Sequence, residues 1–252
     1  MKKVIISILM VAVSATMVAQ DAACSVGLQL GFSQNIYRVN SPTNDVAQQK
    51  TLNGTNLNGF KVGAVFEGNI VAGFGALISL NYTYGGGTTK WQKISDVSIY
   101  PQTRSRYDLH NLELACDWQY KFKLAQKFYF LLYSGPAIQC NLSLHETEFL
   151  KDFDQTTRSQ TKVQHIGEYD DTEMFKSYRR LNVTWGVGIG VQYERYFIRG
   201  GYDFGLVNPY YISNFNQVVK ADGTPLYASQ ATRGREDQWF IKLGIFLWQA
   251  DK

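Results

Sequence analysis

The sequence predicts an all-β protein, an eight-stranded antiparallel up-and-down transmembrane β-barrel behind a cleaved N-terminal signal peptide. Three observations predict this fold: an export signal, eight segments in which apolar and polar residues alternate, and connections that are alternately long and short. After the signal, no stretch approaches the roughly 18 uninterrupted apolar residues that a spanning helix needs. A barrel is therefore the way in which this chain is expected to cross a membrane.

The N-terminus, MKKVIISILMVAVSATMVAQ, has the three parts of a secretory signal peptide. Lys2 and Lys3 precede an apolar run, and small residues follow it. We expect residues 1–20 to be the signal peptide and residues 21–252 to form the barrel domain. A lipoprotein anchored at Cys24 is disfavoured because Asp21 intervenes and the apolar run ends well upstream.

Segment 181–194, LNVTWGVGIGVQYE, is the sixth along the chain and shows the alternation most clearly. Its odd-numbered residues, from Leu181 to Tyr193, are apolar, and its even-numbered residues are glycine or polar. A period of two predicts a strand with one apolar face. Glycine and small amides suit the lumen of a narrow barrel and the apolar face suits lipid, so the polar face is expected to point inward.

The three segments nearest the N-terminus, 25–37, 58–67 and 73–84, repeat this alternation. Each provides at least the ~9 to 11 residues of a tilted transmembrane strand. Their expected lipid-facing residues are Val26, Leu28, Leu30 and Phe32 in the first, Phe60, Val62, Ala64 and Phe66 in the second, and Ala76, Ile78, Leu80, Tyr82 and Tyr84 in the third.

The fourth and fifth segments are 106–120 and 128–144, with residues 121–127 expected to turn the chain between them. Pro136 lies inside the fifth segment, and proline cannot donate to a strand ladder. A bulge or local bend is expected there.

The seventh and eighth segments are 196–207 and 238–248. The eighth resembles the aromatic-ended signal of outer-membrane proteins, but Phe246 and Trp248 share the parity of Lys242 instead of that of the apolar face. Either this strand is bulged or the signal is degenerate.

The long connections, roughly 38–57, 85–105, 145–179 and 208–236, all follow odd-numbered strands. In outer-membrane barrels the short turns are periplasmic and the long loops are extracellular, and this asymmetry fits that arrangement. Aromatic residues near the segment ends are expected to form the two interfacial belts. Tyr82 and Tyr84 mark the outer membrane–water interface, and Trp118 and Tyr196 mark the periplasmic one.

Composition excludes several classes of function. Without Lys2 and Lys3 the chain has 23 basic and 21 acidic residues, a balance that argues against a nucleic-acid binder. The three cysteines, Cys24, Cys116 and Cys140, have no metal-ligand spacing, and no structural disulfide is expected. No cofactor, metal site or small-molecule substrate is expected.

The inward parity places charged residues in the lumen, where a charge must be paired or hydrated. We expect a structural ion-pair network that plugs the lumen, with Lys61 and Arg199 facing acidic partners. Its expected members are Lys61, Glu67, Glu113, Asp117, Glu194, Arg199, Asp203 and Lys242. Two catalytic interpretations, a carboxylate pair at Glu113 and Asp117 and a lipid-modifying Ser134 with His110, are disfavoured because the lumen is narrow and no acidic residue orients the histidine.

Several blocks resemble the PorT-like outer-membrane β-barrel family of Bacteroidetes: YDLHNLELACDWQYKF at 107–122, FYFLLYSGPAIQ at 128–139, GVGIGVQYE at 186–194 and GGYDFGLVN at 200–208. This resemblance implies a noncatalytic protein of the Gram-negative outer membrane that contacts lipid and protein partners of the cell envelope and supports the type IX secretion system. The alternative is a surface adhesin or receptor of the OmpX type that acts through its long outer loops. A narrow diffusion pore is a third and weaker option.

Overall fold

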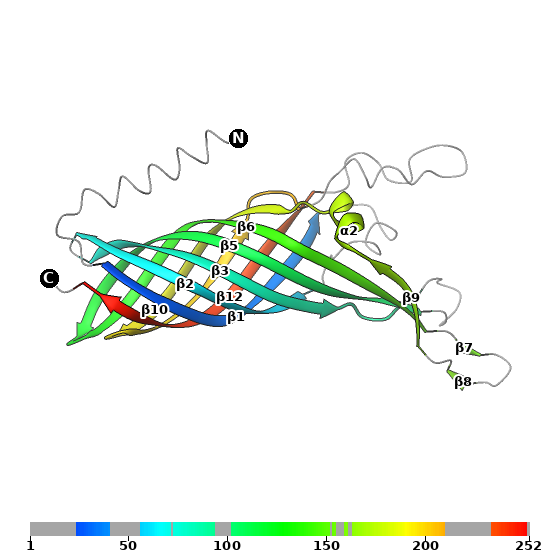
Figure 1. The fold of residues 1–252 in the computed structure, drawn as a ribbon, viewed down its shortest axis with the longest axis horizontal. Helices are drawn as coiled ribbons and strands as arrows, with labels where there is room; N and C mark the ends of the chain where they lie inside the picture. Colours follow the sequence, from blue (N-terminus) through cyan, green and yellow to red (C-terminus); the bar gives the residue numbers. More distant parts are fainter. Residues whose placement is uncertain are drawn as a thin grey trace.

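The computed structural model contains one barrel whose strands are all antiparallel to their neighbours (Figure 1). It describes residues 24–40, 56–71, 73–93, 102–151, 153–154, 159–160, 163–209 and 233–250. The barrel strands are β1 (Cys24–Asn40), β2 (Asn56–Val71), β3 (Phe74–Thr88), β5 (Gln102–Ala125), β6 (Phe128–Lys151), β10 (Leu181–Tyr193), β11 (Tyr196–Gly205) and β12 (Arg233–Gln249). The remaining elements are β4 (Gln92–Lys93), β7 (Phe153–Asp154), β8 (Ser159–Gln160), β9 (Gln164–Tyr169) and helix α2 (Asp171–Ser177).

The eight barrel strands form a closed ring. Each pairs with its chain neighbour, and the first strand, β1, pairs with the last, β12, from Ser25↔Gln249 to Asn40↔Arg233. Closure leaves no unpaired edge within the membrane, where a free backbone group would be costly. The predicted eight-stranded up-and-down barrel is confirmed.

The predicted side of each strand is also confirmed. On β10, Trp185, Val187 and Ile189 are 45%, 45% and 55% exposed, whereas Asn182 and Thr184 are buried at 2% and 0%. The same inversion holds on β1, where Leu28 and Leu30 are half exposed. A barrel that exposes aliphatic residues and buries amides has the opposite pattern to a soluble protein. Such an outer surface is suited to contact with lipid.

The strands are longer than the alternating segments, chiefly at the end with the long connections. Strands β5 and β6 have 24 residues each and continue past the apolar band toward β9 (Figure 1). The turn expected over residues 121–127 is therefore shorter than predicted: β5 continues to Ala125, and the chain turns at residues 126–127. The predicted signal peptide, residues 1–20, lies outside the described residues.

Two local expectations have different outcomes. The register of β12 against β1 shifts between Val26↔Trp248 and Gly27↔Phe246, so Leu247 is the extra residue of a bulge. Phe246 is consequently buried while Trp248 is 55% exposed, and the bulged alternative is confirmed. Of the bulge or local bend expected at Pro136, the bulge is wrong: Trp185↔Pro136 lies in unbroken register, and the register toward β5 is the same on both sides.

The ladder between β6 and β5 accommodates Pro136 by losing pairs instead of gaining a residue. Ala115↔Ala137 and Trp118↔Ser134 are paired, and the two positions between them are not. The absent proline N–H therefore interrupts the hydrogen bonds without changing the register. Within the described residues, no helix is both long enough and apolar enough to cross a membrane.

Candidate functional site

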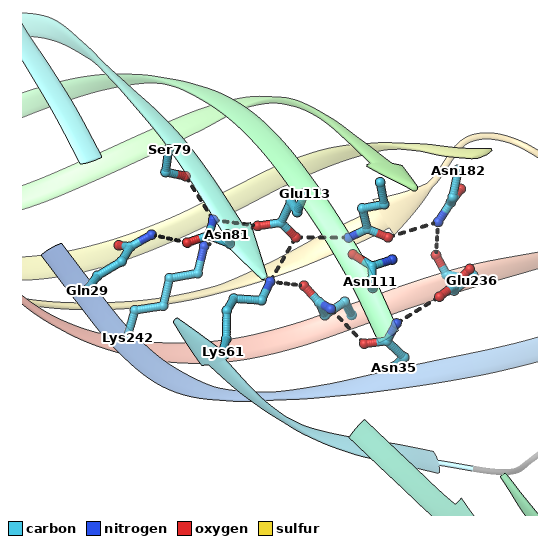
Figure 2. A network of polar contacts seen from close by, with 12 residues as sticks. Gln29, Asn35, Lys61, Ser79, Asn81, Asn111, Glu113, Asn182, Glu236 and Lys242 are labelled. Carbon is cyan, nitrogen blue, oxygen red and sulfur yellow. Dashed lines mark hydrogen bonds and ion pairs between the residues drawn. The ribbon is translucent and has the colours of Figure 1, made fainter. Parts of the chain in front are cut away.

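The centre of the lumen holds a carboxylate between two ammonium groups (Figure 2). Lys61 Nζ donates to Glu113 Oε2 at 2.8 Å, and Lys242 Nζ lies 3.5 Å from Glu113 Oε1. Asn81 Nδ2 donates to the same Oε1 at 3.0 Å. Glu113 and Lys61 are each 1% exposed, so these charges are compensated by one another and not by bulk water.

Hydrogen bonds continue from this centre as a closed ring across the barrel (Figure 2). Lys61 also donates to Gln238 Oε1 at 2.7 Å, and Gln139 Nε2 donates to Glu113 Oε2 at 3.1 Å. The ring closes through Gln238 Nε2 to Asn35 Oδ1 (2.6 Å), Asn35 Nδ2 to Glu236 Oε1 (2.8 Å), and Asn182 Nδ2 to both the Glu236 main-chain oxygen and Gln139 Oε1 (3.3 Å each). Since its members come from six strands, the ring spans the cross-section of the lumen.

Two further ion pairs lie toward the short turns. Arg199 Nη2 is 3.2 Å from Asp117 Oδ2, and its guanidinium lies 3.8 Å from the ring centroid of Tyr133. Lys121 Nζ is 2.6 Å from Glu67 Oε1. Lys121 is not among the residues expected in the lumen because it falls in the segment expected to turn the chain, although it continues the inward parity of Glu113 and Asp117.

The structure brings together seven of the eight residues expected in the lumen. Asp203 is 6% exposed and lies within electrostatic range of Lys242, Lys61 and Glu113. Glu194 is the correction: it occupies the turn between β10 and β11 with φ +52°, and its carboxylate contacts Lys127 at 2.7 Å outside the lumen. The strand ends at Tyr193, so the alternation no longer sets the direction of the Glu194 side chain.

The inward glycines of β10 provide the space that these large side chains occupy. A Cβ on Gly188 would lie 2.3 Å from the Tyr133 ring, and one on Gly186 would lie 2.3 Å from Asp203 Oδ1. The GVGIG segment is therefore a packing feature, since every second residue leaves room for a neighbour's side chain.

We expect Gly188→Val to destabilise the barrel by about 1–3 kcal/mol or more, because the new side chain must displace Tyr133 from its contact with Arg199. Val187→Leu, on the adjacent outward position, is the matched control and should change stability little. Urea unfolding in detergent, followed by heat-modifiable gel mobility, measures both. Equal stability of the two variants would contradict this account of the glycines.

An apolar layer closes the lumen at the end with the long connections. Met174 of helix α2 and Tyr178, which directly follows the helix, are 5% and 4% exposed and pack against inward residues of four barrel strands. Those residues are Tyr37, Leu57, Tyr107, Leu109 and Leu144. Tyr107 Oη donates a hydrogen bond to Glu146 Oε1 at 2.9 Å.

This apolar layer was not expected from the sequence, although a signal was present. Along the inward face of β5, the polar run that ends at Asn111 changes to Leu109 and Tyr107. The helix is positioned by Asp171, whose Oδ1 accepts hydrogen bonds from Leu144 N at 2.9 Å and Ser143 Oγ at 3.0 Å. A second apolar cluster, made of Val65, Leu77, Phe197 and Phe246, lies toward the opposite end.

Because polar, charged and apolar layers succeed one another along the lumen, we expect no open channel. Planar-bilayer recordings of the purified protein should show no large, steady single-channel conductance. Such a conductance would contradict the packing of the lumen that is described here.

Ser134 and His110, the pair considered for lipid modification, lie far apart. Ser134 is paired opposite Trp118, and His110 is eight residues away along β5, about 27 Å of strand. Ser134 Oγ donates to the Gly186 carbonyl oxygen and accepts from Trp185 Nε1, both at 2.9 Å, and His110 Nδ1 contacts Tyr82 Oη at 2.5 Å. Cys24, Cys116 and Cys140 form no disulfide, and within the described part of the chain no metal-binding group of His, Cys, Asp and Glu occurs.

Beyond the apolar band, β4 and β9 join the ends of β5 and β6 in a projecting sheet (Figure 1). Its tip carries a cluster of aromatic and basic side chains. The Arg104 guanidinium lies 4.8 Å from the Trp91 ring and 5.4 Å from the Phe149 ring, and His165 lies 6.0 Å from Phe149. The expected long loop 145–179 is thus largely structured, because it contains the end of β6, strand β9 and helix α2.

Comparisons with solved structures give distant likenesses to small outer-membrane barrels. Ail, the attachment invasion locus protein of Yersinia pestis, in complex with sucrose octasulfate, is 9% identical with a TM-score of 0.33 over 88% of this chain and 97% of that chain. Neisserial surface protein A is 9% identical with a TM-score of 0.40 over 89% and 99%. The N-terminal β-barrel domain of Pseudomonas aeruginosa OprF is 11% identical with a TM-score of 0.27 over 88% and 98%.

No curated protein matches the chain. Residues 18–210, more than half of the 252 residues, match the family model described as an outer membrane protein β-barrel domain. Together with the closed ring of strands and its apolar outer wall, this match shows that the chain belongs to the outer membrane protein β-barrel domain family and is a protein of the outer membrane.

Proposed function

We propose that this protein is a noncatalytic outer-membrane anchor that binds protein partners at the cell surface through its projecting sheet. The observation that carries the proposal is the length of β5 and β6. Each has 24 residues, whereas a tilted strand needs ~9 to 11 to span the membrane. The additional residues serve no spanning purpose and hold the sheet above the bilayer.

The chemistry of the sheet tip supports binding to protein. Tryptophan, arginine and other aromatic residues are the types enriched in the energetic centres of protein interfaces. Arg104 packs against both Trp91 and Phe149, and all three are half-buried, so their conformations are restricted before a partner arrives. A preorganised cluster loses less conformational entropy on binding than mobile loop residues do.

The test replaces residues 149–166 with Asn-Gly, which joins the paired Glu148 and Gly167 by a two-residue turn and retains α2. We expect this variant to fold in the outer membrane and to lose the proteins that co-purify with the wild type under mild detergent. The turn variant Lys127→Gln/Glu194→Gln, at the opposite end, is the control and should retain them. Unchanged co-purification after the replacement would contradict the proposal.

The finer role that we propose is support of type IX secretion, and it rests on the PorT-like resemblance of four strand blocks. A filled eight-stranded lumen cannot pass a folded protein, so the support would concern assembly or maturation of the secretion machinery. A deletion strain should then lose part of its type IX cargo. Full secretion by that strain would exclude this role.

The adhesin alternative is favoured by the same projecting sheet, which faces outward from the cell. The two roles differ in their expected phenotypes. An adhesin with the 149–166 replacement would lose attachment to its surface ligand and keep normal cargo secretion. A secretion component would show the opposite result.

A further inference from the structure

The outer wall over β1, β11 and β12 carries two arginines that are organised by one buried carboxylate. Asp237 has the outward parity of Trp239 and Ile241, yet its side chain is 0% exposed. Its Oδ2 forms ion pairs with Arg38 Nε at 3.2 Å and Arg235 Nε at 2.9 Å, and it accepts a hydrogen bond from Tyr202 Oη at 2.9 Å. Its Oδ1 accepts from Gly205 N at 3.0 Å.

These contacts leave both arginine side chains partly exposed on the outer wall. The Arg38 and Arg235 side chains are 49% and 43% exposed. Arg38 Nη2 donates to Tyr202 Oη at 3.3 Å, while among the described residues the Nη atoms of Arg235 have no hydrogen-bond partner. One carboxylate neutralises one of the two positive charges, so the cluster retains a net charge of about +1.

The cluster lies at the height where the apolar wall ends. Directly below it, Trp239 contacts Phe32 at 5.4 Å between ring centroids and donates Nε1 to Gln34 Oε1 at 2.8 Å, as residues of an interfacial belt do. The register Asp203↔Gln238 places the 40% exposed Phe204 beside Asp237. Since an apolar ring is exposed at the height of the arginines, this height corresponds to the lipid headgroup layer of the outer leaflet.

We propose that Arg38 and Arg235, held by Asp237, bind a phosphate group on the headgroup of an outer-leaflet glycolipid. Phosphate offers three acceptor oxygens. The Nε atoms of both arginines contact Asp237, so the Nη atoms of the two planar guanidinium groups are the donors that would bind these oxygens. The adjacent Phe204 contacts the acyl region of the same lipid, so the source of the phosphate is a lipid and not a soluble anion. This assignment does not depend on the partner-binding role proposed above.

The test measures retention of lipid by the purified full-length protein in detergent with native mass spectrometry. The probes are bis-phosphorylated lipid A and the same lipid after removal of its phosphates. We expect the wild type to bind the phosphorylated lipid more tightly and Arg38→Gln/Arg235→Gln to lose this preference, by roughly fivefold for each arginine. Arg106→Gln, which removes one arginine of an ordinary exposed pair with Asp108, is the matched control.

Two further measurements separate the alternatives. Arg38→Lys/Arg235→Lys keeps the charge but loses the planar forks, so it should fold and still bind less lipid than the wild type. Inorganic phosphate at the same concentration as the lipid should not displace it. Equal retention of both lipids, unchanged retention by the glutamine variant, or full displacement by inorganic phosphate would overturn the proposal.

Discussion

Glu113→Gln is expected to destabilise the folded barrel by about 3–5 kcal/mol. The substitution leaves Lys61 and Lys242 in a buried layer without the carboxylate that both contact, and removing one partner of a buried ion pair has an effect of this size. Urea titration in detergent, read by heat-modifiable gel mobility and tryptophan fluorescence, gives the change in the free energy of unfolding.

Two control variants make this result specific. Glu194→Gln removes a carboxylate that pairs with Lys127 at the exposed turn, and it should leave stability nearly unchanged. The double variant Lys61→Met/Glu113→Gln removes one of the uncompensated charges and should recover part of the lost stability. If Glu113→Gln and Glu194→Gln behaved alike, the ion-pair layer would not be a determinant of folding.

Met174→Ala is expected to weaken the docking of helix α2 by about 2–5 kcal/mol, because it removes a buried side chain from the apolar layer at the outer end of the lumen. The barrel below retains its hydrogen-bond ring, so the loss should be confined to the helix. Hydrogen exchange of residues 171–178 should therefore accelerate while exchange of the central strands stays slow.

The control for this second prediction is Thr172→Ala, on an exposed position of the same helix. Its backbone N–H still donates to Asp170, so exchange in the helix should change little. Uniformly faster exchange over the whole barrel in Met174→Ala would instead show that α2 is required for global stability.

The barrel itself was predictable because side-chain direction in a strand follows from parity alone. Once Trp185 and Ile189 were assigned to lipid, the inward positions of Lys61, Glu113, Arg199 and Lys242 followed by the same rule. The rule fails where regular strand geometry ends, and so it misplaced Glu194 in a turn with positive φ.

Features that depend on contacts between distant segments could not be obtained in this way. Alternation along one strand does not predict the ion pair between Lys121 and Glu67, because it contains no information about which strands face one another across the lumen. The position of α2 depends on Met174 and Tyr178 meeting inward residues of four strands, and a seven-residue helix has too little periodicity to be predicted. The register between β5 and β6 is unchanged at Pro136, because the two strands lose two pairs there and no extra residue is inserted.

The apolar face of each strand contacts lipid, and the glycine and amide face fills the lumen. A variant that retains Trp185 as its single tryptophan, with the other four replaced by phenylalanine, tests this claim in vesicles of lipids brominated on their acyl chains. We expect strong quenching of Trp185 fluorescence by the bromine atoms and only weak quenching by an aqueous quencher. Fluorescence that the brominated lipids leave unchanged would contradict it.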